Sequence, residues 1–224
     1  MLYLKFFIFI FSIKNSFQFQ HPYPNKYMSY SNVKLFIRNL YEIKCKSYNL
    51  EHIVPQSVFK ENKKLKTDMH NIILYPAKMN LHRSNYEYIS NFVIYPNSKL
   101  IDSSGNEIEY IEPIKDQNIC IKTSNKRYFL PEKKYRGLIS RSCMYVLSTY
   151  SEYKDHILNN VINPYTLLTW HHQYPVTEFE KKKNDKIFEQ QGNRNEFISK
   201  PELLTLEMED ILNTKFKAYE KYKY

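Results

Sequence analysis

A carboxylate and an imidazole stand side by side in the stretch NLEHIVPQSVF, residues 49–59. Glu51 and His52 lie among apolar neighbours, where burying a polar group costs free energy unless the group finds a partner. A carboxylate can bind a hard cation, and an imidazole can accept a proton from water. The pair is therefore a candidate for metal-assisted hydrolysis.

The residues that follow predict the elements that would position this pair. The stretches EHIVPQSVF, TDMHNIILYP and AKMNLHRSN indicate a short strand ending near Pro55, a polar basic connection over 59–67, a second strand over 71–75 and a helix over 77–90. This order is that of a ββα-metal finger, at about residues 49–90. Phosphodiester hydrolysis needs both a base and a cation, because water loses a proton while the phosphate gathers negative charge.

Four stretches resemble one nuclease family in order and spacing. They are EHIVPQS (51–57), DMHNIILYP (68–76), MNLHRSN (79–85) and the segment LLTWHHQYPVTEFEKKKNDKIFEQQGNRNEFISKPE (167–202). Together they resemble the endonuclease I family, the secreted and periplasmic bacterial nucleases of the His-Me finger superfamily. The resemblance covers the chain from about 30 to 215.

The resemblance implies a role for three residues. His52 aligns with the general base, and Glu51 and Asn80 align with the ligands of Mg²⁺ or another divalent ion such as Mn²⁺ or Ca²⁺. It also implies cleavage of DNA, and often of RNA, with little sequence preference. Two alternatives stay open: a nuclease that acts on RNA only, and a catalytically inactive, basic nucleic-acid-binding protein. The presence of all three residues argues against the second alternative.

The geometry of a strand constrains how the pair can act. Neighbouring residues of a regular strand point to opposite faces. Glu51 and His52 would therefore face one phosphate only if the strand end were twisted or bulged.

Cationic side chains near the finger are candidates for contact with phosphate. The connection between the two strands carries no arginine, although family members use one there, and lysine supplies charge without bidentate geometry. Arg83 lies about one helical turn past Asn80, where it would contact phosphate or, alternatively, bind a carboxylate that holds the finger to the body. The candidate lysines of the connection are Lys60, Lys63, Lys64 and Lys66.

Asp68 and His70, just before the second strand, allow two interpretations. One of them could orient His52, because a base imidazole usually needs its other nitrogen held. The alternatives are a turn-capping aspartate and a hydrogen-bonded structural histidine.

Two downstream motifs are better explained by structure than by chemistry. In QGNRN (191–195), Gly192 can end the preceding helix in the left-handed conformation, and the flanking polar side chains can satisfy buried carbonyls, which we favour over contact with DNA. The pair His171 and His172 could suggest zinc, but no second ligand pair has suitable spacing. A packed helix end is the preferred interpretation.

The remaining pattern predicts a single α+β domain over residues 21–224, in which several helices surround the finger. Apolar spacing indicates a first helix, and the turn signal Ser-Ser-Gly-Asn between apolar runs indicates a hairpin. A capping box, Thr177-x-x-Glu180, opens a later helix. The other predicted segments are the first helix over 28–45, the hairpin around 103–106, a helix after Pro131 and a last helix opened by Pro201.

Composition indicates an anionic partner. The net charge is +10 and the pI is about 9.2, and a basic surface usually implies nucleic acid or membrane phosphate as the partner. A genome rich in lysine codons is the alternative. With 25% charged residues and a mean hydropathy of −0.60, the chain is expected to be a soluble protein and not a disordered tail. We also expect a monomer.

The N-terminus predicts export. Lys5 followed by an apolar run over 6–13 fits a signal peptide of about residues 1–20 and is too short to span a bilayer. We therefore expect a secreted or periplasmic protein without a membrane anchor once the signal is removed. The alternative is a buried N-terminal strand or helix. The three cysteines, Cys45, Cys120 and Cys143, lack C-x-x-C spacing, so their pairing stays open and buried thiols are the default.

Overall fold

The two strands and the helix expected around the Glu-His pair are present and consecutive. Strand β1 (Tyr48–His52) pairs antiparallel with strand β2 (Ile72–Pro76), with His52 opposite Ile72. The first four residues of β2 are all buried, as its continuous apolar run predicts. Helix α4 (Ala77–Arg83) follows at once and packs on both strands. The finger predicted from the sequence is confirmed.

The computed structural model describes residues 22–43, 46–90, 98–102, 104–109 and 116–221. The apolar run at 6–13 and Cys45 lie outside the described residues. Cys120 and Cys143 are free, buried thiols, as expected by default. Within the described part of the chain, no helix combines the length and the apolar character that crossing a membrane requires.

Helix α4 is shorter than the predicted helix over 77–90. It ends at Arg83, because the next residue, Ser84, takes a positive φ of 51° that is incompatible with a continuing helix. The chain then forms strand β3 (Glu87–Tyr88), which pairs in parallel with strand β7 (Arg127–Leu130). Pairing with a strand distant in sequence overrides the local helical pattern.

The connection between β1 and β2 is helical, whereas the sequence predicted only a polar basic connection over 59–67. Asn62 caps one of its helices by accepting a hydrogen bond from the backbone N–H of Leu65 at 3.0 Å. Phe59 and Leu65 are buried and anchor the connection to the core. The elements are α2 (Gln56–Phe59), α3 (Lys63–Thr67) and the 3₁₀ turn η1 (Met69–Asn71).

A second sheet stands beside the finger and has the strand order β3-β7-β6-β4-β5. Its remaining strands are β4 (Lys99–Ile101), β5 (Glu107–Ile108) and β6 (Ile119–Lys122). The predicted hairpin is confirmed, since β4 and β5 pair antiparallel and Gly105 takes the φ of 87° that the turn needs. Ser103 and residues 110–115 lie outside the described residues.

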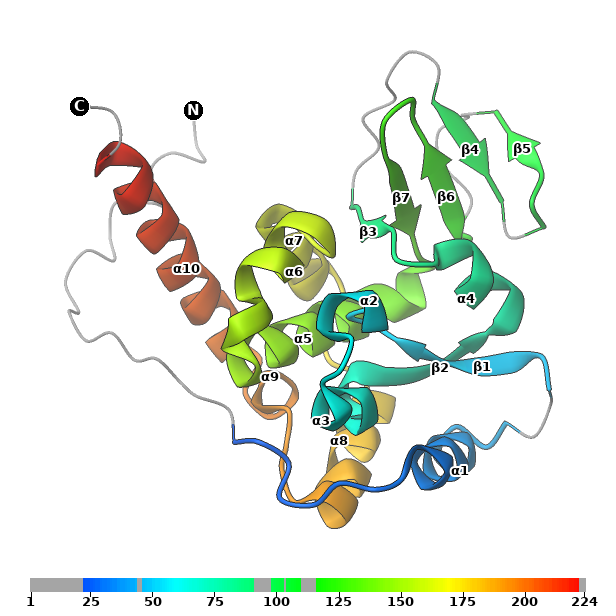
Figure 1. The fold of residues 1–224 in the computed structure, drawn as a ribbon, viewed down its shortest axis with the longest axis vertical. Helices are drawn as coiled ribbons and strands as arrows, with labels where there is room; N and C mark the ends of the chain where they lie inside the picture. The colour runs from blue at the N-terminus through cyan, green and yellow to red at the C-terminus, as the bar shows by residue number, and fades with distance from the viewer. Residues whose placement is uncertain (1–21, 44–45, 91–97, 103, 110–115, 222–224) are drawn as a thin grey trace.

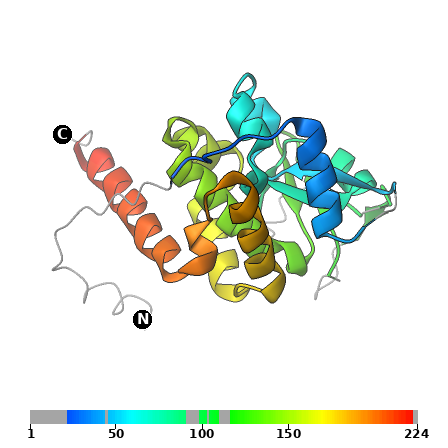
Figure 2. The ribbon, with the colours of Figure 1, turned by 90° about the horizontal axis from the view of Figure 1, so that it is seen from below.

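Helices form the rest of the single α+β domain, in agreement with the predicted fold class. The first helix ends earlier than the predicted range of 28–45, and Ser29 caps its start. Figures 1 and 2 show α5 in the middle of the helical part and α10 projecting from the end opposite to the finger. The helices are α1 (Tyr30–Leu40), α5 (Lys133–Thr149), α6 (Lys154–Asn160), α7 (Pro164–Gln173), α8 (Glu178–Gln191), α9 (Glu196–Ser199) and α10 (Glu202–Lys221), with the 3₁₀ turn η2 (Ser151–Tyr153) before α6.

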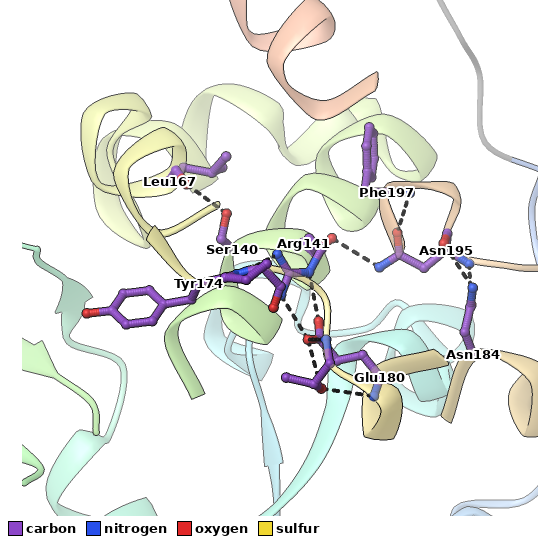
Figure 3. Close-up of polar contacts among 10 residues, drawn as sticks. Ser140, Arg141, Leu167, Tyr174, Glu180, Asn184, Asn195 and Phe197 are labelled. Carbon is purple, nitrogen blue, oxygen red and sulfur yellow. Dashed lines mark hydrogen bonds and ion pairs between the residues drawn. The ribbon is translucent and has the colours of Figure 1, made fainter. Parts of the chain in front are cut away.

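A buried polar network joins α5, α8 and α9 (Figure 3). The guanidinium of Arg141 donates to both carboxylate oxygens of Glu180, at 2.7 and 2.8 Å. Glu180 also completes the predicted capping box with Thr177. The amide of Asn195 donates to the backbone carbonyl of Arg141 at 3.1 Å. The QGNRN motif thus lies in the scaffold, and Gly192 ends α8 with a left-handed φ of 80°, as predicted.

Candidate active site

The imidazole of His52 is fixed at the end of β1 by contacts on both ring nitrogens. Its Nε2 lies 2.9 Å from the backbone carbonyl of Lys66. Because a carbonyl only accepts, Nε2 carries the proton and the lone pair of the neutral ring is on Nδ1. The side-chain amide of Gln56 donates to Nδ1 at 3.1 Å, and the ring of Tyr30 stacks on the imidazole with centroids 6.0 Å apart. Both Gln56 and Tyr30 are contacts that sequence reasoning missed.

Burial lowers the pKa of His52, and the nearby charges of Lys66 and Arg83 lower it further, whereas the hydrogen bond to the carbonyl of Lys66 acts in the opposite direction. The ring is only 6% exposed. Near neutral pH the imidazole is therefore unprotonated, which is the state that accepts a proton.

The carboxylate of Glu51 is buried and incompletely satisfied. It is 5% exposed, and its Oε1 lies 3.0 Å from Nη1 of Arg83, yet Oε1 accepts no well-aligned hydrogen bond. Burial raises the pKa of Glu51 to about 7, although the charge of Arg83 lowers it. A buried acceptor of this kind is suited to a cation.

Glu51 and His52 point to different sides of a regular strand. Strand pairing continues without a bulge through both residues, which lie opposite Ile73 and Ile72. The Glu51 carboxylate reaches Arg83 of α4, whereas the His52 ring reaches the carbonyl of Lys66 in α3. Pairing in this strand pair is thus regular through Glu51 and His52, and the two side chains have separate partners on the two sides of β1.

Asn80 presents an amide oxygen beside the same strand. Its Nδ2 donates to the backbone carbonyl of Leu50 at 2.9 Å. With the amide nitrogen engaged, Oδ1 is the end of the side chain that remains to bind a ligand. Asn80 is half-buried, and it approaches the residue next to Glu51 from α4.

Arg83 holds the end of β1 to α4. Its guanidinium donates to the backbone carbonyls of Ile53 at 2.7 Å and Ser84 at 3.0 Å, and lies over the ring of Tyr88 at 4.6 Å. The side chain is 1% exposed and pairs with Glu51. These contacts favour the carboxylate-binding alternative, while contact with a substrate phosphate stays a prediction.

Asp68 and His70 belong to a buried network beneath the finger. Asp68 is fully buried and accepts hydrogen bonds from the hydroxyls of Tyr145 and Tyr150, at 2.7 and 2.9 Å. The Nε2 of His70 lies 3.2 Å from the carbonyl of Asn193 and therefore donates to it. Asp68 also caps η1 by accepting from the backbone N–H of His70 at 3.0 Å, so these contacts favour the alternative of a turn-capping aspartate and a structural histidine. The contact that holds His52 is made by the carbonyl of Lys66.

Asn71 connects the two strands of the finger and was not identified from the sequence. Its side chain accepts from the backbone N–H of Val54 at 2.8 Å and donates to the Val54 carbonyl at 3.1 Å. Its own carbonyl accepts from the N–H of Ile53 at 2.9 Å. The stretch DMHN (68–71) contained the signal for this role, because a buried asparagine side chain usually satisfies backbone groups.

The four lysines of the connection lie on and beside α3. Lys60, Lys63 and Lys64 are exposed and Lys66 is half-buried. The ammonium groups of Lys64 and Lys66 lie over tyrosine rings of the N-terminal segment, at 5.8 Å from Tyr27 and 5.7 Å from Tyr30. Tyr30 in turn stacks on His52. The ammonium group of Lys66 is therefore connected to the candidate base through the Tyr30 ring.

His171 and His172 lie in the last turn of α7. This position agrees with the interpretation that the pair belongs to a packed helix end. Their rings are 5.3 Å apart, and burial lowers the pKa of His171 to about 4. Among the described residues, no group of three or more His, Cys, Asp and Glu side chains could hold a metal ion. A site formed by one carboxylate and one amide, as at Glu51 and Asn80, is not a group of this kind.

The buried state of His70 predicts a pH dependence of stability. Burial is the largest cause that lowers its pKa from 6.5 to about 3. Below pH 6.5 the imidazole of His70 is therefore protonated in the unfolded chain but not in the native protein. The unfolding free energy decreases as the pH is lowered. In His70→Gln this loss is absent. We expect the unfolding free energy of the wild type, relative to that of His70→Gln, to fall by about 1.4 kcal/mol per pH unit below pH 6.

Urea denaturation of both proteins between pH 4 and pH 8 measures this difference. Glu51 and His52 titrate in both proteins, so their contributions cancel. A difference that is constant across this range would mean that His70 titrates normally in the native state.

The fold and the site define a class: a ββα finger with a histidine at the end of its first strand, a carboxylate beside it and an amide on its helix. The family described as Endonuclease I matches residues 26–202. The chain belongs to this family, and the resemblance inferred from the motifs is confirmed. Membership supports a nuclease activity that acts on nucleic acid. A comparison with curated proteins found no match.

Proposed function

We propose that the protein is a divalent-metal-dependent endonuclease that hydrolyses phosphodiester bonds of DNA with little sequence preference, with RNA as a second candidate substrate. The observation that carries this proposal is the state of His52. Its Nε2 is committed to a backbone carbonyl and its Nδ1 lone pair is available for a proton, beside a buried carboxylate that lacks a full set of donors.

His52 is the base in this proposal. A water molecule donates to Nδ1 in the place that the amide of Gln56 occupies in the free protein. As the water oxygen forms its bond to phosphorus, its proton passes to Nδ1. The bond from phosphorus to the ribose oxygen breaks, and that oxygen keeps the electron pair and takes a proton from solvent water. The carbonyl of Lys66 keeps the ring in place and stabilises its protonated form.

Glu51 and Asn80 are the residues that would hold the metal ion. They fit a hard cation such as Mg²⁺, which takes few protein oxygens and keeps several waters. The buried Oε1 of Glu51 lacks a hydrogen-bond partner, and the amide of Asn80 is oriented by its contact with the carbonyl of Leu50. When bound, the ion stabilises the negative charge that develops on the phosphate.

A plasmid-nicking assay tests the proposal. We expect conversion of supercoiled plasmid to the nicked and linear forms with Mg²⁺ and its loss with EDTA. Cleavage of RNA but not of plasmid would make the protein an RNA-only nuclease. Binding without cleavage of either, under any divalent ion, would make it an inactive nucleic-acid-binding protein.

Removing a ligand residue is expected to weaken the use of metal. Glu51→Ala and Asn80→Ala each delete an oxygen ligand of a hard cation, so each should need more Mg²⁺ for half-maximal cleavage. Raising the Mg²⁺ concentration should partly restore their activity and should not restore that of His52→Ala. Cleavage rates across a Mg²⁺ titration measure this. Wild-type Mg²⁺ dependence in both ligand variants would contradict the assignment.

A further inference from the structure

Two adjoining hollows lie between the finger and the second sheet, and they share Tyr86, Lys122 and Arg127. The larger is about 540 Å³ and the smaller about 290 Å³, sizes typical of ligand sites. We call the two together the Tyr86 groove. Its walls come from the segment after α4, the turn between β6 and β7, the start of α2, and α6, and Figure 1 shows α2 between α6 and the second sheet. Other lining residues used below are Ser57, Leu81, Asn85, Glu87 and Lys126.

The Tyr86 groove adjoins both ends of the catalytic finger. Ser57 lines it and directly follows Gln56, whose amide lies 3.1 Å from Nδ1 of His52. On the other side, Asn85 and Tyr86 line it just after α4. A strand of nucleic acid held in the groove therefore lies against the start of α2, the helix that carries the Gln56 contact to the candidate base.

The charges of the groove favour an anion. Among its lining residues, Lys122, Lys126 and Arg127 are cationic, and Glu87 is the acidic one. Glu87 is buried and pairs with Lys126 at 2.5 Å, so this pair carries no net charge. Lys122 and Arg127 remain as the cations that would meet an anionic ligand.

Lys122 and Arg127 stand directly opposite each other on β6 and β7. Like charges at directly opposed positions of an antiparallel pair destabilise the sheet. Both side chains are exposed and line the same groove. An anion placed between them would relieve this repulsion, and the phosphates of a nucleic acid strand are suitable anions.

Arg127 also offers a flat surface. Its guanidinium lies over the ring of Tyr86 at 5.5 Å and donates to the Tyr86 hydroxyl. A guanidinium supported in this way is a plane on which an unpaired base can stack. Leu81, which is 79% exposed on α4, adds apolar surface at the other end of the groove.

We propose that the Tyr86 groove binds the nucleic acid strand next to the bond that is cut, with Lys122 and Arg127 on its phosphates and one base stacked on Arg127. This inference rests on the proposed nuclease function and adds the path of the substrate. The backbone and the face of a base are common to all sequences, so the groove confers binding with little sequence preference.

Salt-dependent binding tests the phosphate contacts. Lys122→Gln is compared with Lys200→Gln, an equal charge change at an exposed residue that does not line the groove. Both are made in a His52→Ala background, and affinity for a fluorescent single-stranded oligonucleotide is measured by anisotropy at several salt concentrations. We expect Lys122→Gln to reduce the log-log salt slope by about 0.7, and Lys200→Gln to leave it unchanged.

Variants of the stacked pair test the base contact. Tyr86→Ala removes the support under Arg127 and should weaken binding of single strands roughly 5- to 150-fold, which is the loss of one stacked base. Tyr86→Phe keeps the ring and should stay within about twofold of the parent on the same scale. Thermal unfolding of each variant confirms that it is folded at the assay temperature.

The groove proposal is overturned if Lys122→Gln matches Lys200→Gln in salt slope and Tyr86→Ala matches Tyr86→Phe in affinity, for single strands and for a duplex of equal length. That result leaves the proposed function intact as long as the protein with His52 present cuts plasmid. Failure of the protein with His52 to cut any nucleic acid is a separate result, and it overturns the proposed function.

Discussion

His52→Ala is expected to slow cleavage by about 10²–10⁴, the usual contribution of a positioned base. The substitution removes the lone pair on Nδ1 that accepts the proton of water. It leaves Glu51 and Asn80 in place, and the contact of Asn80 with Leu50 does not involve the imidazole. The affinity for Mg²⁺ and for nucleic acid should therefore change little. Single-turnover cleavage rates at saturating protein, together with a Mg²⁺ titration, separate the loss of rate from a loss of binding.

Two other histidines serve as controls for this expectation. His172→Ala removes an exposed imidazole at the end of α7 and should leave the rate unchanged. His70→Ala opens a cavity in a buried network, so it should lower stability, while the protein that remains folded cuts at a near-normal rate. The base assignment is wrong if His70→Ala abolishes cleavage in folded protein while His52→Ala cuts like the wild type.

The sequence predicted the finger because its signals are local. Glu51-His52 at a strand end and Pro76 before a helix act within a few residues, and outside the finger the capping box of Thr177 and Glu180 does the same for α8. The same local pattern failed at α4, where pairing between β3 and the distant β7 ends the helix at Arg83.

The candidate site was predicted by residue type more than by contact. Glu51, His52 and Asn80 were predicted as site residues, a role that stays a prediction, and the structure places them around the end of β1. The group that holds His52 was not identified, because it is the backbone carbonyl of Lys66 and every residue carries a carbonyl. The Tyr86 groove was missed as well, since Lys122 and Arg127 reach the finger only through the second sheet.

Arg83→Met is expected to have the second large effect, on stability. Arg83 is 1% exposed and is the partner of the buried Glu51 carboxylate at 3.0 Å. Removing one member of a buried ion pair leaves the other charge uncompensated, which typically costs about 3–5 kcal/mol of unfolding free energy. The carbonyls of Ile53 and Ser84 also lose their donors. Urea denaturation without divalent ions at pH 8, above the pKa of about 7 that Glu51 has in the wild type, measures the loss.

A second substitution distinguishes the two roles considered for Arg83. In Arg83→Met/Glu51→Gln the uncompensated charge is gone, so much of the lost stability should return, although metal binding should not. If Arg83 instead serves mainly to contact substrate phosphate, Arg83→Met should unfold like the wild type and cut far more slowly. Because Arg83 donates to the carbonyl of Ile53, where the chain turns from His52 toward α2, and to the carbonyl of Ser84 after α4, we expect the stability result. Arg83 then acts on catalysis by fixing the strand end from which Glu51 and His52 diverge.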